Sequence, residues 1–293
     1  MWQKLVEGEP KAFMKLELKK FDMRNLKDDS VVLFIGKRNT GKSILVSDVM
    51  YHHRNMPIGV VISPTERANH FFESFVPNML LYDEFTSEIV AKFIDRQEKL
   101  TDHFNSEKKK YGKTDLDPRA FLILDDCLYD KTWPADKNIR CLFMNGRHYK
   151  VLFLITMQYP LGIPPHLRSN VDYVFIFREN QVKNRERIYQ QYAGMFPTFE
   201  IFNQVMDQCT ENYECLVIDN KVQSNKLEDQ IYWYKATIRN DFKTCSKELW
   251  DMQSLEMERQ SLGIAPPMED DEDYDPQVMK KKSAPTIRVR KQN

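Results

Sequence analysis

The stretch Gly36-Lys37-Arg38-Asn39-Thr40-Gly41-Lys42-Ser43 fits the Walker A pattern G-x-x-x-x-G-K-[ST] at every fixed position. This pattern is typical of a loop that binds phosphate groups. An apolar, β-rich run, Val31-Val32-Leu33-Phe34-Ile35, leads into the loop, and helical periodicity over residues 44–50 follows it. The motif requires this order of strand, loop and helix, so the sequence predicts a nucleotide site here.

The chemistry expected of this loop follows from its geometry. Glycine at both ends lets backbone N–H groups converge on a phosphate, and the helix that begins near Gly41 adds the positive end of its dipole. Lys42 can reach the β and γ phosphates, and the Ser43 hydroxyl is placed to ligate Mg²⁺, which bridges the same phosphates in such sites. We therefore expect a phosphate-bearing ligand, ATP, bound together with Mg²⁺.

A second apolar run, Ala120-Phe121-Leu122-Ile123-Leu124, ends in two carboxylates, Asp125 and Asp126. Two charges at the end of a buried strand are costly unless they meet a cation or water there, and a Walker B element supplies both. Asp125 is predicted to hold Mg²⁺ opposite Ser43. Asp126 is predicted to orient or deprotonate the attacking water.

A third apolar run, residues 151–155, ends in Thr156-Met157-Gln158. At the tip of a strand next to the Walker B strand, Gln158 can hydrogen-bond the attacking water or the γ-phosphate. The alternative is a polar residue that only begins a loop.

Two arginines flank this third strand, and either can stabilise transition-state charge in its own subunit or in a neighbour. Arg147 precedes the strand and Arg168 follows it. Arg147 enters the strand at the end opposite the phosphates of its own subunit, so we expect it to act in trans on a neighbouring subunit. The alternative for Arg147 is an ion pair with a carboxylate that holds its loop.

The rest of the chain alternates between strand and helix patterns. Strands are predicted over residues 58–62, 173–177, 214–219 and 231–234, the last as an edge strand. Helices are predicted over residues 86–110, 180–192 and 199–209. This alternation indicates a three-layer α/β fold with a mostly parallel central sheet.

These patterns divide the chain into four parts. Residues 1–30 form a lead-in with a half-exposed strand at Met14, Leu16 and Leu18, and residues 31–240 form the P-loop domain. Residues 241–265 carry an amphipathic helix around 249–262. Residues 266–293 form a disordered tail with an acidic block followed by a basic one. The basic block could bind DNA or an acidic partner, and the alternative is a tail that only keeps the protein soluble.

Composition limits the class of protein. The 43 basic and 43 acidic side chains cancel, so net charge gives no evidence for a nucleic-acid partner. The five cysteines lack C-x-x-C spacing, which favours a reducing compartment and no structural metal. No apolar run approaches the length of a membrane span, and residues 1–9 carry no signal-peptide core. We expect a soluble intracellular protein.

The phosphate loop, Asp125-Asp126 and Gln158 together resemble the HerA/FtsK group of P-loop ATPases. The block Asn145-Gly146-Arg147-His148 with Arg168-Ser169-Asn170 is most similar to its viral branch, the poxvirus-type genome-packaging ATPases of large nucleocytoplasmic DNA viruses. The resemblance covers about residues 15–240. It implies an additional-strand, RecA-like fold and a ring-forming motor that hydrolyses ATP to drive double-stranded DNA into a preformed capsid.

The resemblance also implies roles and partners. The roles are phosphate binding for Lys42, Mg²⁺ binding for Ser43 and Asp125, general base for Asp126, γ-phosphate sensing for Gln158 and arginine finger for Arg147. The partners are double-stranded DNA, further copies of the chain in a homo-oligomeric ring, and a capsid or portal-type viral protein. The expected location is the virus assembly site in the host cytoplasm, with the virion as a second location. The wider group commonly has Glu where this chain has the shorter Asp126.

Two other classes share part of this pattern. A P-loop nucleotide kinase would have the same loop, with Arg178, Arg185 and Arg187 as its lid, but it would not need Asp126 or Gln158, because its acceptor is not water. A nucleotide-dependent switch would not need the second acid either. A packaging motor with its own nuclease needs a further domain with clustered acids, and too little chain follows residue 240 for one.

Overall fold

The computed structural model describes residues 16–127 and 133–262. The chain divides into two compact units at Gln253/Ser254, and the helix α9 (Lys247–Ser261) runs across this boundary. Met14 and the predicted acidic and basic tail lie outside the described residues.

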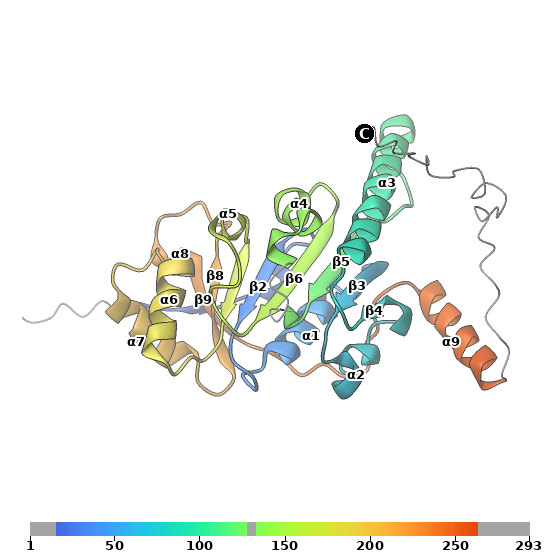
Figure 1. Ribbon diagram of the computed structural model, residues 1–293. Coiled ribbons are helices and arrows are strands. Elements are labelled where there is room, and N and C mark those ends of the chain that lie inside the picture. The colour runs from blue at the N-terminus through green and yellow to red at the C-terminus, as the bar shows by residue number, and fades with distance from the viewer. Residues whose placement is uncertain (1–15, 128–132, 263–293) are drawn as a thin grey trace, which may run out of the picture. The chain divides into compact units, whose positions relative to one another are not determined.

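The described residues form one nine-stranded sheet, in the order β1-β9-β8-β7-β2-β6-β5-β3-β4. Figure 1 shows the sheet running across the view from β9 to β4. All neighbouring strands are parallel except β8, which is antiparallel to both β7 and β9. The strands are β1 (Lys19–Lys20), β2 (Val31–Ile35), β3 (Ile58–Ile62), β4 (Leu81–Tyr82), β5 (Ala120–Leu124), β6 (Val151–Met157), β7 (Tyr173–Ile176), β8 (Glu214–Asp219) and β9 (Ile231–Lys235).

The strand β6 lies between the P-loop strand β2 and the Walker B strand β5. Ile35 of β2 pairs with Met157, and Leu124 of β5 pairs with Ile155. This inserted strand is the one expected of the additional-strand class. Because all three strands are parallel, their carboxyl ends meet at one edge of the sheet, where ligands of open α/β folds bind.

Apolar side chains cover both faces of the sheet, as the three-layer prediction requires. One core packs the sheet against α3, α4, α6 and α7, and the other packs it against α1 and the segments around Phe21, Phe72 and Phe242. The helices are α1 (Lys42–His52), α2 (Glu66–Asn69), α3 (Ser87–Tyr111), α4 (Lys137–Asn145), α5 (Pro165–Arg168), α6 (Val182–Tyr192), α7 (Phe199–Cys209), α8 (Leu227–Gln230) and α9.

The long helix α3 begins and ends within one residue of its predicted bounds, 86–110, because both of its ends carry local capping signals. Thr86 caps its first turn, since its side-chain oxygen accepts a hydrogen bond from the backbone N–H of Ile89 at 3.3 Å. The helix ends at Gly112, whose φ of 75° lies in the left-handed region that glycine tolerates. Both signals are local in sequence.

Three expectations are wrong in detail. Leu16 and Leu18 are not in a strand but pack against the core, and the lead-in strand is the pair that follows, Lys19–Lys20. This strand β1 pairs with β9, so β9 is not the edge strand. The helix α9 has the predicted position but buries none of its residues. Alternation in sequence reports which side chains share a face, whereas strand pairing depends on a backbone partner elsewhere in the chain.

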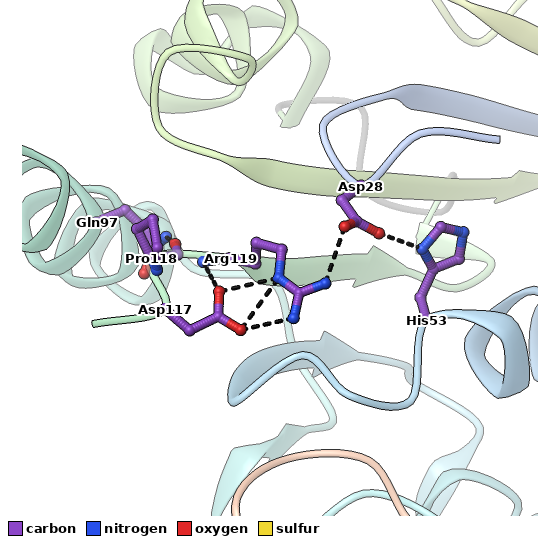
Figure 2. Close-up of polar contacts among 6 residues, drawn as sticks. All are labelled: Asp28, His53, Gln97, Asp117, Pro118 and Arg119. Carbon is purple, nitrogen blue, oxygen red and sulfur yellow. Dashed lines mark hydrogen bonds and ion pairs between the residues drawn. The ribbon is translucent and has the colours of Figure 1, made fainter. Parts of the chain in front are cut away.

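A polar network joins the lead-in to the elements around the sheet (Figure 2). The Arg119 guanidinium lies between two carboxylates, donating to Asp117 at 2.6 Å and to Asp28 at 2.9 Å. Asp28 also bonds Nδ1 of His53 at 2.6 Å, and the Gln97 amide of α3 donates to the carbonyl preceding Arg119 at 2.8 Å. The hydrogen bond from His53, followed by that from Arg119, lowers the pKa of Asp28 to about 2. Asp28, in the turn before β2, is thereby bonded to His53 at the end of α1 and to Arg119 at the start of β5.

Candidate nucleotide site

The phosphate loop begins directly after β2. The Gly36 N–H donates to the carbonyl of Met157 at 3.0 Å, which ties the loop to the end of β6. A Cβ at Gly36 would lie 2.7 Å from Cβ of Phe177, so only glycine fits there without displacing the chain. Gly41 has a φ of +99° and directly precedes the first turn of α1. The two glycines are therefore required for separate reasons, close packing and a left-handed backbone.

The Lys42 ammonium is folded back onto its own loop. Its Nζ donates to the carbonyl oxygens of Gly36 at 2.6 Å and of Lys37 at 2.8 Å. Burial lowers the pKa of Lys42, and the negative charges of Asp126 and Asp125 act in the opposite direction. The charge lies within the loop, where it can exchange carbonyl partners for phosphate oxygens.

The Walker B carboxylates are held by the neighbouring strand through Thr156. Asp125 is only 7% exposed, and its oxygens accept hydrogen bonds from the hydroxyls of Thr156 at 2.7 Å and Ser63 at 3.0 Å. The same Thr156 hydroxyl accepts the backbone N–H of Asp126 at 2.9 Å. One hydroxyl therefore fixes both acids. Burial raises the pKa of the Asp125 carboxyl, against the lowering effect of these two hydroxyls.

Asp126 and Gln158 meet at the tips of their strands. The Gln158 side-chain amide donates a hydrogen bond to the Asp126 carboxylate. Asp126 has a φ of +53°, in a region that few non-glycine residues adopt and that occurs often at functional sites. The predicted base and the predicted sensor therefore form one polar pair.

These side chains share one cavity of about 800 Å³ at the carboxyl edge of the sheet. Ser43 and Asp125 both line it and offer the hard oxygen ligands that Mg²⁺ prefers, so the residues present fit this ion. The cavity is lined by Arg38, Asn39, Gly41, Lys42, Ser43, Ile44, Thr65, Asn69, Asp125, Asp126, Gln158 and Tyr213.

Arg147 and Arg168 do not belong to this cavity. Arg147 precedes β6 at its amino end, and its guanidinium pairs with the buried carboxylate of Asp172. The second oxygen of Asp172 accepts the N–H of Val31 at 2.9 Å. Arg168 ends α5 and lies over the ring of Tyr192, 5.7 Å from its centroid. Arg147 thus forms an ion pair with a carboxylate, as expected if its role is to hold its own loop. Its action in trans stays a prediction.

Several residues of the site were missed or given no role by sequence reasoning. Ser63 and Thr156 lie at strand ends, a position that favours contact with a ligand, but their bonds to Asp125 depend on strand order. Glu179 is buried and pairs with Lys37 of the loop at 2.6 Å. Tyr213 lines the cavity from the turn before β8, and nothing in the sequence near it indicates a nucleotide site.

Two of the three arginines that a nucleotide kinase would use in its lid, Arg185 and Arg187, bond residues outside the phosphate cavity. Arg185 pairs with Asp207 of α7 at 2.7 Å, and Arg187 bonds the Tyr159 hydroxyl at 2.5 Å. Arg178 lines a hollow beside the phosphate loop. The helix α6, which carries Arg185 and Arg187, packs on the sheet through Ile188 and is part of the core instead of a separate lid.

The phosphate loop after β2, the two acids after β5 and the parallel strand β6 between them define a P-loop NTPase of the additional-strand class. Protein L437 of Acanthamoeba polyphaga mimivirus is 41% identical over 241 residues, which are 82% of this chain and 84% of that protein. Protein 075L of Invertebrate iridescent virus 6 is 40% identical over 217 residues, which are 73% of this chain and 80% of that protein. Both relatives are uncharacterised. The chain belongs to the family of P-loop NTPases of large DNA viruses that these two proteins represent. This confirms the predicted relationship to proteins of large nucleocytoplasmic DNA viruses.

Among solved structures, the chain is similar to the DNA-packaging ATPase B204 from Sulfolobus turreted icosahedral virus, with a TM-score of 0.49 and 17% identity over 71% of this chain and 98% of that chain. The genome-packaging NTPase B204 from Sulfolobus turreted icosahedral virus 2, in complex with AMPPCP, gives a TM-score of 0.46 and 18% identity over 72% of this chain and 100% of that chain.

No protein-family model matches the chain. Among the helices within residues 16–127 and 133–262, none combines the length and the apolar character needed to cross a bilayer.

Proposed function

We propose that this protein is an ATP-hydrolysing motor that translocates double-stranded viral DNA into a preformed capsid. The observation that carries the proposal is the contact between Asp126 and Gln158 beside the phosphate loop. A second acid and a polar sensor on the inserted strand serve attack by water, and neither is needed for transfer to another acceptor. Membership of a family from large DNA viruses and the packaging-ATPase motifs of the sequence support the motor role.

The chain's own residues would perform the reaction as follows. Lys42 leaves its loop carbonyls and binds the β and γ phosphate oxygens. Ser43 and Asp125 would hold Mg²⁺, which when bound would supply positive charge to these phosphates. Asp126 accepts a proton from the attacking water. Asp126 is shorter than the Glu common in the wider group. The Gln158 amide nitrogen already bonds its carboxylate, so we propose that the amide oxygen of Gln158 helps to hold this water.

The motor is proposed to work as a homo-oligomeric ring, with Arg147 of one subunit reaching the γ-phosphate of the next. DNA and a capsid or portal-type viral protein are its proposed partners. The proposed locations are the host-cytoplasmic assembly site and the virion.

The proposal is tested by measuring phosphate release from ATP with and without double-stranded DNA. We expect release to rise with added DNA, and Lys42→Ala to show none. A rate of phosphate release that does not change when DNA is added would contradict the proposed motor function. Transfer of phosphate from ATP to a nucleoside monophosphate would favour the kinase, and tight ATP binding without turnover would favour a switch.

A further inference from the structure

We propose that Tyr213 is the platform on which the base of the bound nucleotide stacks. The inference rests on the nucleotide site proposed above and adds to it a residue for the base. Tyr213 lies in the turn between α7 and β8, far along the chain from the phosphate loop. Its ring nevertheless reaches the loop, since a Cβ at Gly41 would lie 3.6 Å from ring atom Cδ1.

The ring of Tyr213 is exposed where a packed aromatic side chain would be buried. The residue is 68% exposed and lines the same cavity as Lys42 and Ser43. Large aromatic side chains usually bury their area, so one that stands open beside a phosphate site has a free face to offer. A flat base is the part of a nucleotide that such a face binds, and every base has a π-face for stacking.

The backbone of this turn also departs from what tyrosine prefers. Asn212 has a φ of +51° and Tyr213 a φ of +65°, both in the left-handed region. Asparagine visits this region readily, but a bulky aromatic residue does so rarely. Strained conformations of this kind tend to cluster at ligand sites. The Tyr213 side chain therefore occupies a position that backbone preference alone would give to Asn or Gly.

There is room for a base beside the ring. A second hollow of about 310 Å³ adjoins the phosphate loop, and Asn39 and Tyr213 line both this hollow and the phosphate cavity. Polar side chains of Arg178, Thr210 and Glu214 also line this hollow. A nucleotide with its phosphates on the loop can thus place its base against Tyr213, with hydrogen-bonding groups within the same hollow.

The test separates binding of the base from binding of the phosphates. Tyr213→Asn removes the ring and suits the left-handed backbone, so the variant should fold, while Tyr213→Phe keeps the ring. Calorimetric titrations with ATP and with inorganic tripolyphosphate, each with Mg²⁺, give the two affinities. We expect Tyr213→Asn to weaken ATP binding by roughly tenfold to a hundredfold and to leave tripolyphosphate binding unchanged. Tyr213→Phe should bind both ligands as the wild type does.

Tyr111→Asn is the matched control, because Tyr111 is 62% exposed and lies at the end of α3, outside both hollows. It should change neither affinity. The proposed role of Tyr213 is overturned if Tyr213→Asn binds ATP as tightly as the wild type does, or if its affinities for ATP and tripolyphosphate fall equally. Unchanged ATP binding with lost DNA-stimulated turnover overturns it as well and assigns the ring to DNA. A wild type that binds neither ligand overturns the nucleotide site itself.

Discussion

The Gln158 side-chain amide is hydrogen-bonded to the Asp126 carboxylate, which joins the tip of β6 to the tip of β5. An ionised carboxylate only accepts hydrogen bonds, so the amide nitrogen is the donor and the amide oxygen remains available to a water or a ligand. The predicted base, Asp126, and the predicted sensor, Gln158, therefore form one hydrogen-bonded unit. A change at either residue is expected to disturb the other.

The first prediction concerns this base. Asp126→Asn should bind ATP and fail to cleave it, because the amide keeps the size of the side chain and cannot accept the proton. We expect phosphate release to fall on the order of 10² to 10⁴-fold. Lys42→Ala provides the contrast, since it should abolish hydrolysis and also weaken ATP binding. Normal turnover in Asp126→Asn would remove this residue from the mechanism.

The second prediction concerns Thr156, whose hydroxyl holds both acids. Thr156→Val keeps the shape but leaves a buried oxygen of Asp125 and the N–H of Asp126 without this partner. We expect the free energy of unfolding to fall by about 1–3 kcal/mol and ATP hydrolysis to be lost. Thr156→Ser, which keeps the hydroxyl, is the control for both chemical denaturation and phosphate release. Equal behaviour of the two variants would show that the hydroxyl is not needed.

The third prediction tests the close packing of the phosphate loop. Gly36→Ala places a Cβ 2.7 Å from Cβ of Phe177, in a part of the core that cannot easily move. The cost should be about 1–3 kcal/mol in unfolding free energy, with weaker ATP binding. Gly194→Ala is the matched control, because a Cβ there meets nothing within 4 Å. If both variants are as stable as the wild type, the loop has more freedom than its contacts indicate.

The fourth prediction is that Arg147 acts in trans. Its side chain is 57% exposed despite the ion pair with Asp172, so it is open to a neighbouring subunit. Arg147→Ala subunits keep an intact loop, and Lys42→Ala subunits keep an intact Arg147. Each variant alone should be nearly inactive, since an arginine finger is worth on the order of 10³ to 10⁵ in rate. Mixed rings should recover part of the activity.

The structural alternative for Arg147 makes the opposite prediction. If its role is to hold Asp172, mixing restores nothing, and Arg147→Ala and Asp172→Asn both lower the thermal midpoint. Mixed assembly is confirmed by capturing a tagged Lys42→Ala subunit and probing for its partner. No recovery at any ratio would leave Arg147 a structural residue.

The fifth prediction concerns pH. Asp28 has a folded-state pKa of about 2, lowered from the ordinary value of 3.8, so its ionised form stabilises the fold above the unfolded pKa. This stabilisation should be lost as pH falls from about 4 to about 2. Because the side chain is 40% exposed, solvent screening reduces the effect to about 1 kcal/mol. Asp28→Asn should flatten the dependence of unfolding free energy on pH in this range, and an unchanged slope would contradict the assignment.

The sequence alone determined the class of fold and the strands and helix that surround the candidate site. The strand and helix on either side of the phosphate loop, the strand before Asp125 and the strand before Gln158 were predicted at the positions where they occur, because each depends on residues that are neighbours in the chain. Glycine spacing, apolar runs and helix caps act over a few residues. The three-layer arrangement followed from the alternation of these elements.

Tertiary structure alone decided how the parts are held together. The Thr156 bonds to both acids, the pairing of Lys37 with Glu179 and the approach of Tyr213 to Gly41 each join segments that are distant in the chain. The pairing of β1 with β9 is of the same kind. A local pattern shows that a side chain is polar and lies at a strand end. Which partner it meets depends on strand order and register, because a neighbouring strand brings in residues from elsewhere in the sequence.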